Sequence, residues 1–490
     1  MREVKFVDTT FRDGQASLWA ENMRTGMMLA VAEKLDSGGF QAAELIAASH
    51  IKKCVRELRE DPFERIRLVA KKMTKTPLRA VGTERLSAFE LTSDSVNDLW
   101  FERLAANGIR QIRISNPSND PVGWTKAVVR AKRLGLATFL NLTYSVSPKH
   151  NDEYYARKTR EGAALKPDYL CIKDPGGLLT PERTIALIKV IRREAPGFPI
   201  ELHTHCTTGL GPLCALEAIK LGIQLIDTAV PPLANASSNP SIFNIAQNAR
   251  ALGYTPVIDE TALRLVEKDL TTIAKSENLP IGAPVEYDCS QYVHQVPGGM
   301  ISNFQFQLNN LGMLHRLPEV LEETIRVRAD LGYPIMVTPL SQFVGSQAAI
   351  NVIKGERYTE ITDPVIQYAA GLWGEEAASE VDAEVKAKIL DRPRAKEFAA
   401  WQPPEVPIQE LRNKLGGPDL SDDELLMRYV VGHEDVDAMR LAGAPKAYSD
   451  RKNPLLALVQ QLTQHQGCNR IYLRKQEFSV TLEKRNTAQP

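Results

Sequence analysis

Short apolar runs alternate with longer amphipathic segments through residues 1–250 of this chain. The runs have the length and the content of aliphatic and β-branched residues that are typical of buried parallel strands. They cover residues 4–8, 42–45, 78–81, 112–115, 138–143, 169–173, 200–205 and 225–229. The intervening segments have the apolar spacing of helices, as at 25–37, 93–107, 181–194 and 209–221. This alternation favours a closed (β/α)₈ TIM barrel over an open sheet.

After residue 254 the pattern becomes mostly helical. We expect helices at 260–278, 318–331 and 346–354, a loop at 297–300, a polar linker at 443–454, a helix at 455–464, and strands at 470–473 and 478–482. The sequence therefore predicts an α/β protein with three domains. They are a TIM barrel at 1–285, a mostly helical domain at 286–442, and a linker with a small C-terminal α+β segment at 443–490.

Composition narrows the class of protein. Lysine plus arginine and aspartate plus glutamate both number 60, so no net charge favours nucleic acid or an anionic membrane as a partner. No apolar run is long enough to span a membrane, and the first residues lack the core of a signal peptide. The cysteines are scattered without paired spacing. We therefore expect a cytoplasmic protein.

Two histidines, His203 and His205, are the strongest chemical clue in the chain. Residues i and i+2 of a strand point to the same side, so both imidazoles would project together. In a TIM barrel the carboxyl ends of the strands carry the catalytic groups, and Asp13 and Lys173 also map there. An acid and two imidazoles suit a divalent metal ion.

Lys173 could join such a site only in a modified form, because an ammonium group has no lone pair to donate. Burial and a nearby cation would lower its pKa, and the neutral amine could then take up carbon dioxide as an anionic carbamate. The alternative is a buried ion pair between Lys173 and Asp174. Likewise, Arg12 could merely pair with Asp13, and residues 174–177 could form an ordinary turn before a helix capped by Thr180.

Eight motifs occur in a fixed order along residues 1–370. They are DTTFRDG (8–14), EDPFERIR (60–67), SVSPKH (145–150), CIKDPGGLLTP (171–181), HTHCTTG (203–209), SSNPS (237–241), VPGGMISN (296–303) and VTPLSQFVG (337–345). With them the chain resembles the biotin-dependent carboxyltransferases: the carboxyltransferase domain of pyruvate carboxylase, the oxaloacetate decarboxylase α-subunit and the transcarboxylase 5S-like proteins. The resemblance implies a barrel followed by a helical conserved carboxylase domain.

The resemblance also implies roles for single residues. Asp13, carbamylated Lys173, His203 and His205 would bind a divalent metal, zinc first, with cobalt or manganese as alternatives. Arg12 would help to stabilise a developing enolate. Ser302 would shuttle a proton with the biotin ring, and Gly298 and Gly299 would lie in the same biotin-binding segment. These residues form the catalytic, metal-binding and cofactor-binding sets that we expect.

Several positions depart from the pattern of the family. Ala16 replaces a glutamine, Thr83 replaces the arginine that binds a keto acid, and Asn116 replaces an aspartate. Arg79 and Arg85 are near Thr83 but out of register. Since a carboxylate substrate favours a bidentate arginine, we expect an acceptor other than pyruvate or oxaloacetate, such as a neutral cyclic amide or another carbonyl compound.

The chain lacks the Met-Lys-Met segment on which this family carries biotin. We therefore expect biotin to arrive on a separate biotin carboxyl carrier protein, loaded by a biotin carboxylase. Residues 458–484 resemble the start of an acetyl-CoA carboxylase carrier subunit, and a small docking or dimer-forming element is an equal interpretation. The resemblance favours a homodimer.

Other functions use the same residues. Carboxylation could assist the cleavage of the acceptor, as in a biotin-dependent ring-opening amide hydrolase. A metal-dependent lyase or aldolase has a similar barrel start and histidine pair, but the carboxylase-type segment after residue 286 disfavours it. A scaffold without chemistry is disfavoured by the intact set of ligand types.

Overall fold

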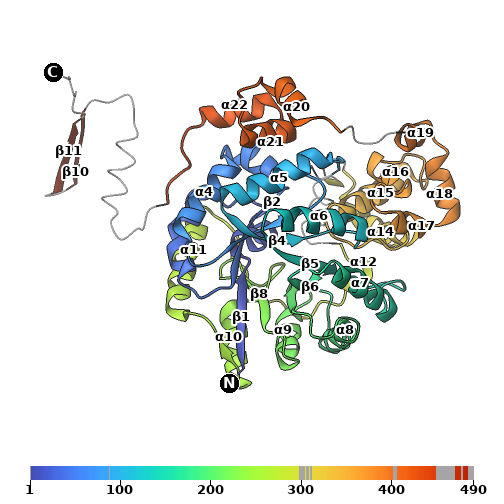
Figure 1. The fold of residues 1–490 in the computed structure, drawn as a ribbon, viewed down its shortest axis with the longest axis horizontal. Coiled ribbons are helices and arrows are strands. Elements are labelled where there is room, and N and C mark those ends of the chain that lie inside the picture. The colour runs from blue at the N-terminus through green and yellow to red at the C-terminus, as the bar shows by residue number, and fades with distance from the viewer. Residues whose placement is uncertain are drawn as a thin grey trace.

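The fold is described from a computed structural model (Figure 1). It describes residues 2–87, 89–296, 304, 308–309, 312–400, 405–448, 470–475 and 478–483. Eight parallel strands form a closed barrel, in which β1 pairs with both β2 and β8. The strands are β1 (Glu3–Asp8), β2 (Ala42–Ala47), β3 (Leu78–Gly82), β4 (Ile109–Ile114), β5 (Ala137–Thr143), β6 (Tyr169–Asp174), β7 (Ile200–Thr204) and β8 (Leu225–Thr228). A short strand, β9 (Thr255–Pro256), adds to β1.

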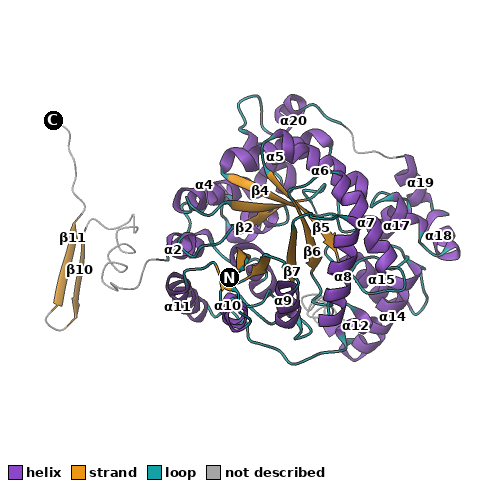
Figure 2. Ribbon diagram, turned by 60° about the horizontal axis from the view of Figure 1, so that its bottom comes forward, coloured by secondary structure: helices purple, strands orange, loops and turns teal. Residues whose placement is uncertain are grey.

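Helices surround the strands, which lie at the centre of the view in Figure 2. The barrel helices are α2 (Thr25–Asp36), α4 (Pro62–Lys72), α5 (Asp94–Asn107), α6 (Pro121–Arg133), α7 (Asp152–Ala164), α8 (Pro181–Glu194), α9 (Gly211–Lys220), α10 (Ile242–Ala251) and α11 (Glu260–Ser276). Shorter turns follow β1 and β2: a π-helical turn at Thr10–Gly14, α1 (Gln15–Trp19), α3 (His50–Lys53) and a π-helical turn at Cys54–Leu58. Side chains of Asp, Ser, Asn or Thr cap many of the barrel helices; Thr180, as expected, caps α8 by accepting from the backbone N–H of Arg183.

A second group of helices follows the barrel. They are α12 (Gln291–His294), α14 (Leu317–Asp330), α15 (Leu340–Lys354), α16 (Asp363–Ala369), α17 (Glu375–Ser379), α18 (Ala383–Leu390) and α19 (Pro393–Ala400), with a 3₁₀ turn at Leu314–Arg316. Their apolar side chains form a core of their own around Phe343, Tyr368 and Trp373. The architecture is thus a TIM barrel with a mostly helical region, as the sequence predicts.

Three further helices share the core of the barrel instead. They are α20 (Ile408–Leu415), α21 (Asp422–Val431) and α22 (His433–Leu441), at the top of Figure 1. Leu411, Leu425 and Met439 belong to the barrel's apolar cluster, and Asp423 receives hydrogen bonds from Arg67 and Arg103 of the barrel helices. The domain boundaries at 285 and 442 remain a prediction.

The predicted strands and helices of the barrel and of the second group of helices begin within two residues of the observed starts, apart from two larger shifts. Strand β4 begins at Ile109 rather than at 112. Helix α15 begins at Leu340 rather than at 346, because Leu340, Phe343 and Val344 are buried against the second core and extend its apolar face. The expectation for the start of this helix was therefore wrong.

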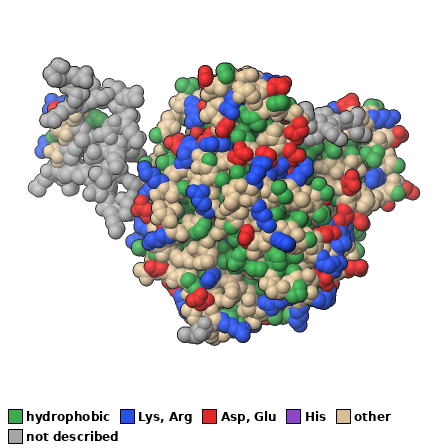
Figure 3. Space-filling model, in the orientation of Figure 1, with side chains coloured by type: hydrophobic (Ala, Val, Ile, Leu, Met, Phe, Trp, Pro, Cys, Tyr) green, Lys and Arg blue, Asp and Glu red, His purple; other side chains and the backbone are tan. Residues whose placement is uncertain are grey.

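The C-terminal strands pair as an antiparallel hairpin, β10 (Arg470–Lys475) with β11 (Phe478–Glu483). The predicted loop at 297–300 and helix at 455–464 lie outside the described residues. Within the described ranges, no helix combines the length and the apolar character needed to cross a membrane. Figure 3 shows acidic and basic side chains interspersed over one face, as the balanced composition suggests.

Candidate active site

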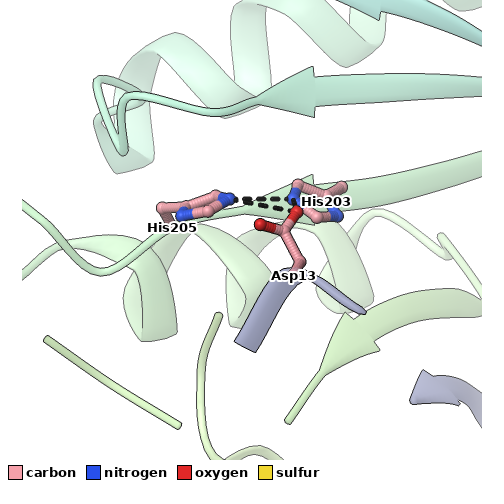
Figure 4. A group of neighbouring side chains, drawn as sticks. All are labelled: Asp13, His203 and His205. Carbon is pink, nitrogen blue, oxygen red and sulfur yellow. Dashed lines mark hydrogen bonds and ion pairs between the residues drawn. The ribbon is translucent and has the colours of Figure 1, made fainter. Parts of the chain in front are cut away.

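Two imidazoles and a carboxylate converge at the carboxyl end of the barrel. His203 lies in β7 and His205 directly after it, and their Nε2 atoms are 3.0 Å apart. The Oδ2 atom of Asp13, from the turn after β1, is 3.0 Å from Nε2 of His203 and 3.4 Å from Nε2 of His205. Figure 4 shows the two rings facing each other with the carboxylate beside them. Residues that are far apart in the sequence thus present three potential metal-ligand atoms to one point.

Lys173 joins this cluster from the end of β6. Its Nζ atom is 2.9 Å from Oδ2 of Asp13 and 2.6 Å from Nε2 of His203. Burial lowers the pKa of the Lys173 ammonium, although Asp13 opposes this effect. Burial also favours the neutral form of Asp13, but the charges of Arg12 and Lys173 hold its pKa well below the ordinary value.

The alternative ion pair between Lys173 and Asp174 is not formed. The Asp174 carboxylate accepts from the backbone N–H groups of Leu178 and Leu179 and from the hydroxyl of Thr204. It therefore organises the turn between β6 and α8. Lys173 points to the opposite side of the strand, toward the cluster, as strand alternation requires.

The far nitrogen of each imidazole is held by an acceptor. Nδ1 of His203 is 2.5 Å from Oδ2 of Asp227 in β8, and Nδ1 of His205 is 2.6 Å from the carbonyl oxygen of Ser237. With Nδ1 protonated, each ring directs the lone pair of Nε2 into the cluster. Two converging lone pairs beside a carboxylate are the donor set of a divalent cation, so these residues fit the metal that the sequence predicts.

A buried ionic network supports the cluster from inside the barrel. Arg113 of β4 makes ion pairs with Glu44, Glu201 and Asp227. Arg12 donates to Asp13 and Glu44, with its terminal nitrogen 2.7 Å from each carboxylate. Arg12 therefore does pair with Asp13, and it also remains on the wall of the cavity described below.

Arg113, Glu44 and Asp227 lie outside the sequence motifs and were not predicted. Each is a charged residue inside an apolar strand, with the side chain fully buried. A charged residue within an apolar strand is the sequence signal that could have identified them, because a charge in the barrel interior needs partners on other strands. Which partners it finds depends on the closure of the barrel.

A cavity of about 1150 Å³ opens over the cluster, between the barrel mouth and the second group of helices. The positions that depart from the family pattern line it, namely Ala16, Thr83 and Asn116, together with Ala47, Ala48 and Ser49. The Thr83 hydroxyl donates to the backbone carbonyl of Arg85. Neutral side chains thus occupy the positions at which the family pattern has charged or amide groups.

The two arginines near Thr83 have different surroundings. Arg79 lies deep in the barrel, where it pairs with Glu201 at 2.7 Å and donates to Gln111. Arg85, by contrast, lines the cavity. Only Arg85 is therefore placed to meet a ligand. Gly298, Gly299 and Ser302, expected at the biotin, lie outside the described residues.

Comparison with protein families gives two matches that together cover most of the chain. Residues 3–270 match the family described as HMGL-like, and residues 292–487 match the family described as Conserved carboxylase domain. The first match spans the barrel, and the second begins in the helices beyond it.

Several relatives carry carboxylase names. The chain is 37% identical over 391 residues to a pyruvate carboxylase subunit of Methanocaldococcus jannaschii, covering 79% of this chain and 68% of the relative. It is 32% identical over 400 residues to the 2-oxoglutarate carboxylase large subunit of Hydrogenobacter thermophilus, covering 81% and 61%. The carboxyl transferase domain of Rhizobium etli pyruvate carboxylase has the same fold, with a TM-score of 0.81 at 22% identity over 90% of this chain and 77% of that one.

Proposed function

The chain belongs to the biotin-dependent carboxyltransferase family, and on this premise we propose that it transfers a carboxyl group from carboxybiotin on a separate carrier protein to a small acceptor other than pyruvate or oxaloacetate. The observation that carries the proposal is the convergence of Asp13, Lys173, His203 and His205 below a cavity whose acceptor-binding positions are changed.

The proposed metal ligands are Asp13, His203, His205 and a carbamate formed on Lys173. A divalent ion held there, zinc or alternatively cobalt or manganese, would stabilise negative charge on the oxygen of the acceptor. The burial that lowers the pKa of Lys173 supports the carbamate, because only the neutral amine reacts with carbon dioxide. Asp227 and Ser237 hold the imidazoles in the orientation that this role requires.

Arg12 is proposed to add a second positive charge for the developing enolate. Its guanidinium is held by Asp13 and Glu44 and borders the cavity, so it is fixed before the acceptor arrives. Ser302 is proposed to relay a proton to the biotin ring, with Gly298 and Gly299 in the biotin-binding segment. A biotin carboxylase would load the carrier, and the chain itself would act as a homodimer.

The proposal that the acceptor is neither pyruvate nor oxaloacetate is supported by the wall of the cavity. Thr83 and Asn116 offer single neutral hydrogen-bonding groups, and Ala16 offers none. A carboxylate next to the reacting carbonyl would lack a bidentate arginine partner at these positions.

The metal content of the purified chain tests the core of the proposal. Elemental analysis is expected to find about one divalent ion per chain, since the donor set forms one site. Lys173→Ala is expected to lose most of that ion, whereas Lys189→Ala, on the exposed side of α8, is expected to retain it. Full retention of metal by Lys173→Ala would remove Lys173 from the site.

A further inference from the structure

Arg85 differs from the other basic residues around the cavity. It lies in the loop between β3 and α5. The remaining lysine and arginine side chains on the cavity wall each belong to an ion pair with a carboxylate; they are Arg12, Arg113, Lys126 and Lys173. No carboxylate in the described part of the chain lies within ion-pair distance of Arg85.

The guanidinium of Arg85 is nevertheless held in place. The central carbon of the guanidinium, Cζ, lies 3.5 Å from the ring centroid of Trp373, and one terminal nitrogen donates to the carbonyl oxygen of Leu372 at 2.6 Å. A second, longer hydrogen bond of 3.3 Å reaches the carbonyl oxygen of Phe89. Stacking on an indole and neutral carbonyl acceptors fix the group without neutralising its charge.

Such an arrangement has an energetic consequence. Burial lowers the pKa of Arg85 to about 9, with no acidic group to oppose the effect. A partly desolvated cation without a counter-charge is costly unless an anion pairs with it, so the site favours an anionic ligand. The planar fork of a guanidinium matches a carboxylate in particular.

We propose that Arg85 binds a carboxylate of the acceptor, on the cavity wall formed by Trp373. This inference rests on the proposed carboxyl transfer and specifies its substrate class. Asp13, Lys173 and His203 lie at the carboxyl end of the barrel, below the cavity, whereas Arg85 contacts the loop between α16 and α17. An acceptor that reaches from one to the other has its carboxylate remote from the reacting carbonyl and is longer than pyruvate.

The acceptor is thus an anionic carbonyl compound rather than the neutral one expected from Thr83 alone. Position 83 lacks the arginine of the family pattern, and Arg85 supplies a positive charge at another place on the cavity wall. The carboxylate-binding charge is thus moved rather than removed. The position of the positive charge, and not only its presence, then selects among carbonyl acids.

A binding measurement with a matched pair of probes tests this proposal. Glutarate and its neutral diamide, glutaramide, are titrated into the full chain at constant ionic strength, and the fluorescence of Trp373 reports binding beside Arg85. The wild-type chain is expected to bind glutarate at least about tenfold more tightly than glutaramide, since a charge-assisted bidentate pair is lost with the diamide. Trp373→Phe is expected to remove the signal.

Arg85→Gln is expected to weaken glutarate binding about tenfold or more and to leave glutaramide binding unchanged. Arg264→Gln is the matched control, because Arg264 also stacks on an aromatic ring, that of Phe243, but on the outside of the barrel. Equal binding of the two probes by the wild-type chain, or undiminished glutarate binding by Arg85→Gln, would overturn the proposal.

A second measurement needs no variant. Phenylglyoxal modifies accessible arginines, and mass spectrometry locates the modified residue. Glutarate, but not glutaramide, is expected to protect Arg85; protection by both or by neither contradicts the proposal. Neither measurement requires metal or carboxybiotin. The binding of glutarate at Arg85 is therefore tested independently of carboxyl transfer, and a failure of one proposal can be distinguished from a failure of the other.

Discussion

The carboxylate of Asp227 fixes the orientation of His203 through one contact of 2.5 Å to Nδ1. Asp227→Asn keeps the shape of this side chain but can present an N–H group to the imidazole, which disturbs the tautomer that leaves Nε2 free. We expect the affinity for a divalent metal to fall about 10- to 100-fold, measured by competition with a chelator. Asp259→Asn, at the cap of α11, should leave the affinity unchanged. Unchanged affinity in Asp227→Asn would show that the contact does not orient a ligand.

Asp8 makes stability depend on pH. Burial raises its pKa from 3.8 to about 7, and among the described residues Oδ2 has no hydrogen-bond partner. The folded state therefore keeps a proton that the unfolded chain releases, so the stability that Asp8 provides is lost as the pH rises from about 4 to about 7. Asp8→Asn removes the charge at every pH.

Urea denaturation across this window measures the effect. The free energy of unfolding of Asp8→Asn, relative to the wild-type chain, is expected to rise by up to roughly 4 kcal/mol between about pH 4 and pH 8. At the acidic end the two proteins should be nearly equal, because a protonated acid and an amide are similar. Parallel pH profiles for the two chains would contradict the assignment.

At the scale of single residues, the site was predictable where it depends on local order. His203 and His205 share a face because of strand periodicity, and Asp13 and Lys173 lie at the ends of strands of the same barrel. The partners of these residues were not predictable in the same way. Asp227 meets His203 because β8 pairs with β7 in a register that no local pattern encodes.

Among the elements, α7 and α17 are joined by a salt-bridge cluster. The carboxylate of Glu376 in α17 accepts from Arg157 at 2.8 Å and from Lys158 at 2.7 Å, both in α7. Although partial burial favours the neutral acid, these hydrogen bonds lower the pKa of Glu376 to about 2. Its stabilising effect is therefore present above the ordinary pKa of 4.5 and is lost as the pH falls toward 2.

Glu376→Gln is expected to lower the free energy of unfolding at neutral pH by about 1 kcal/mol, a modest value because solvent screens a carboxylate that is 33% exposed. The difference from the wild-type chain should shrink as the pH falls below about 4.5. Glu375→Gln, the exposed neighbour in the same helix, should change stability little. A difference that is independent of pH would show that the charge of Glu376 is not responsible.

The elements of the barrel followed from apolar periodicity, because a strand buried on both faces gives a short continuous run of apolar residues. The start of α15 could not be predicted in this way, since Leu340 and Phe343 face a core to which other helices contribute. The packing of α20–α22 on the barrel was also not predictable from the sequence. It depends on pairs such as Arg56 with Asp435, 379 positions apart, which no local pattern links.

For the whole molecule, the substrate range follows from the geometry of the cavity as a unit. Pyruvate, tested with carboxylated carrier, is expected to be a poor carboxyl acceptor, and oxaloacetate, tested with carrier whose biotin is free, a poor carboxyl donor, because Thr83 cannot hold a carboxylate beside the reacting carbonyl. Thr83→Arg is expected to improve their use. Release of pyruvate from oxaloacetate, and its consumption in the reverse direction, can be followed with a coupled dehydrogenase. Brisk turnover of pyruvate by the wild-type chain would refute the proposal of a different acceptor.

The use of a carrier by the whole molecule predicts a physical partner. If biotin arrives on a separate protein, an affinity-tagged chain expressed in its native host should retain a biotinylated polypeptide, detectable with labelled avidin after gel separation. The cavity is bordered by both the barrel and the helical region, so a biotin arm must enter between them and the carrier must dock near their junction. Docking is expected to be weak and transient, because the carrier also has to visit the carboxylase, and a reversible cross-linker is therefore added before purification.

An unrelated tagged barrel enzyme from the same host serves as the control for adventitious capture. A carrier absent from repeated cross-linked preparations, with metal still bound by the chain, would leave the metal site intact but would contradict the role of carboxybiotin.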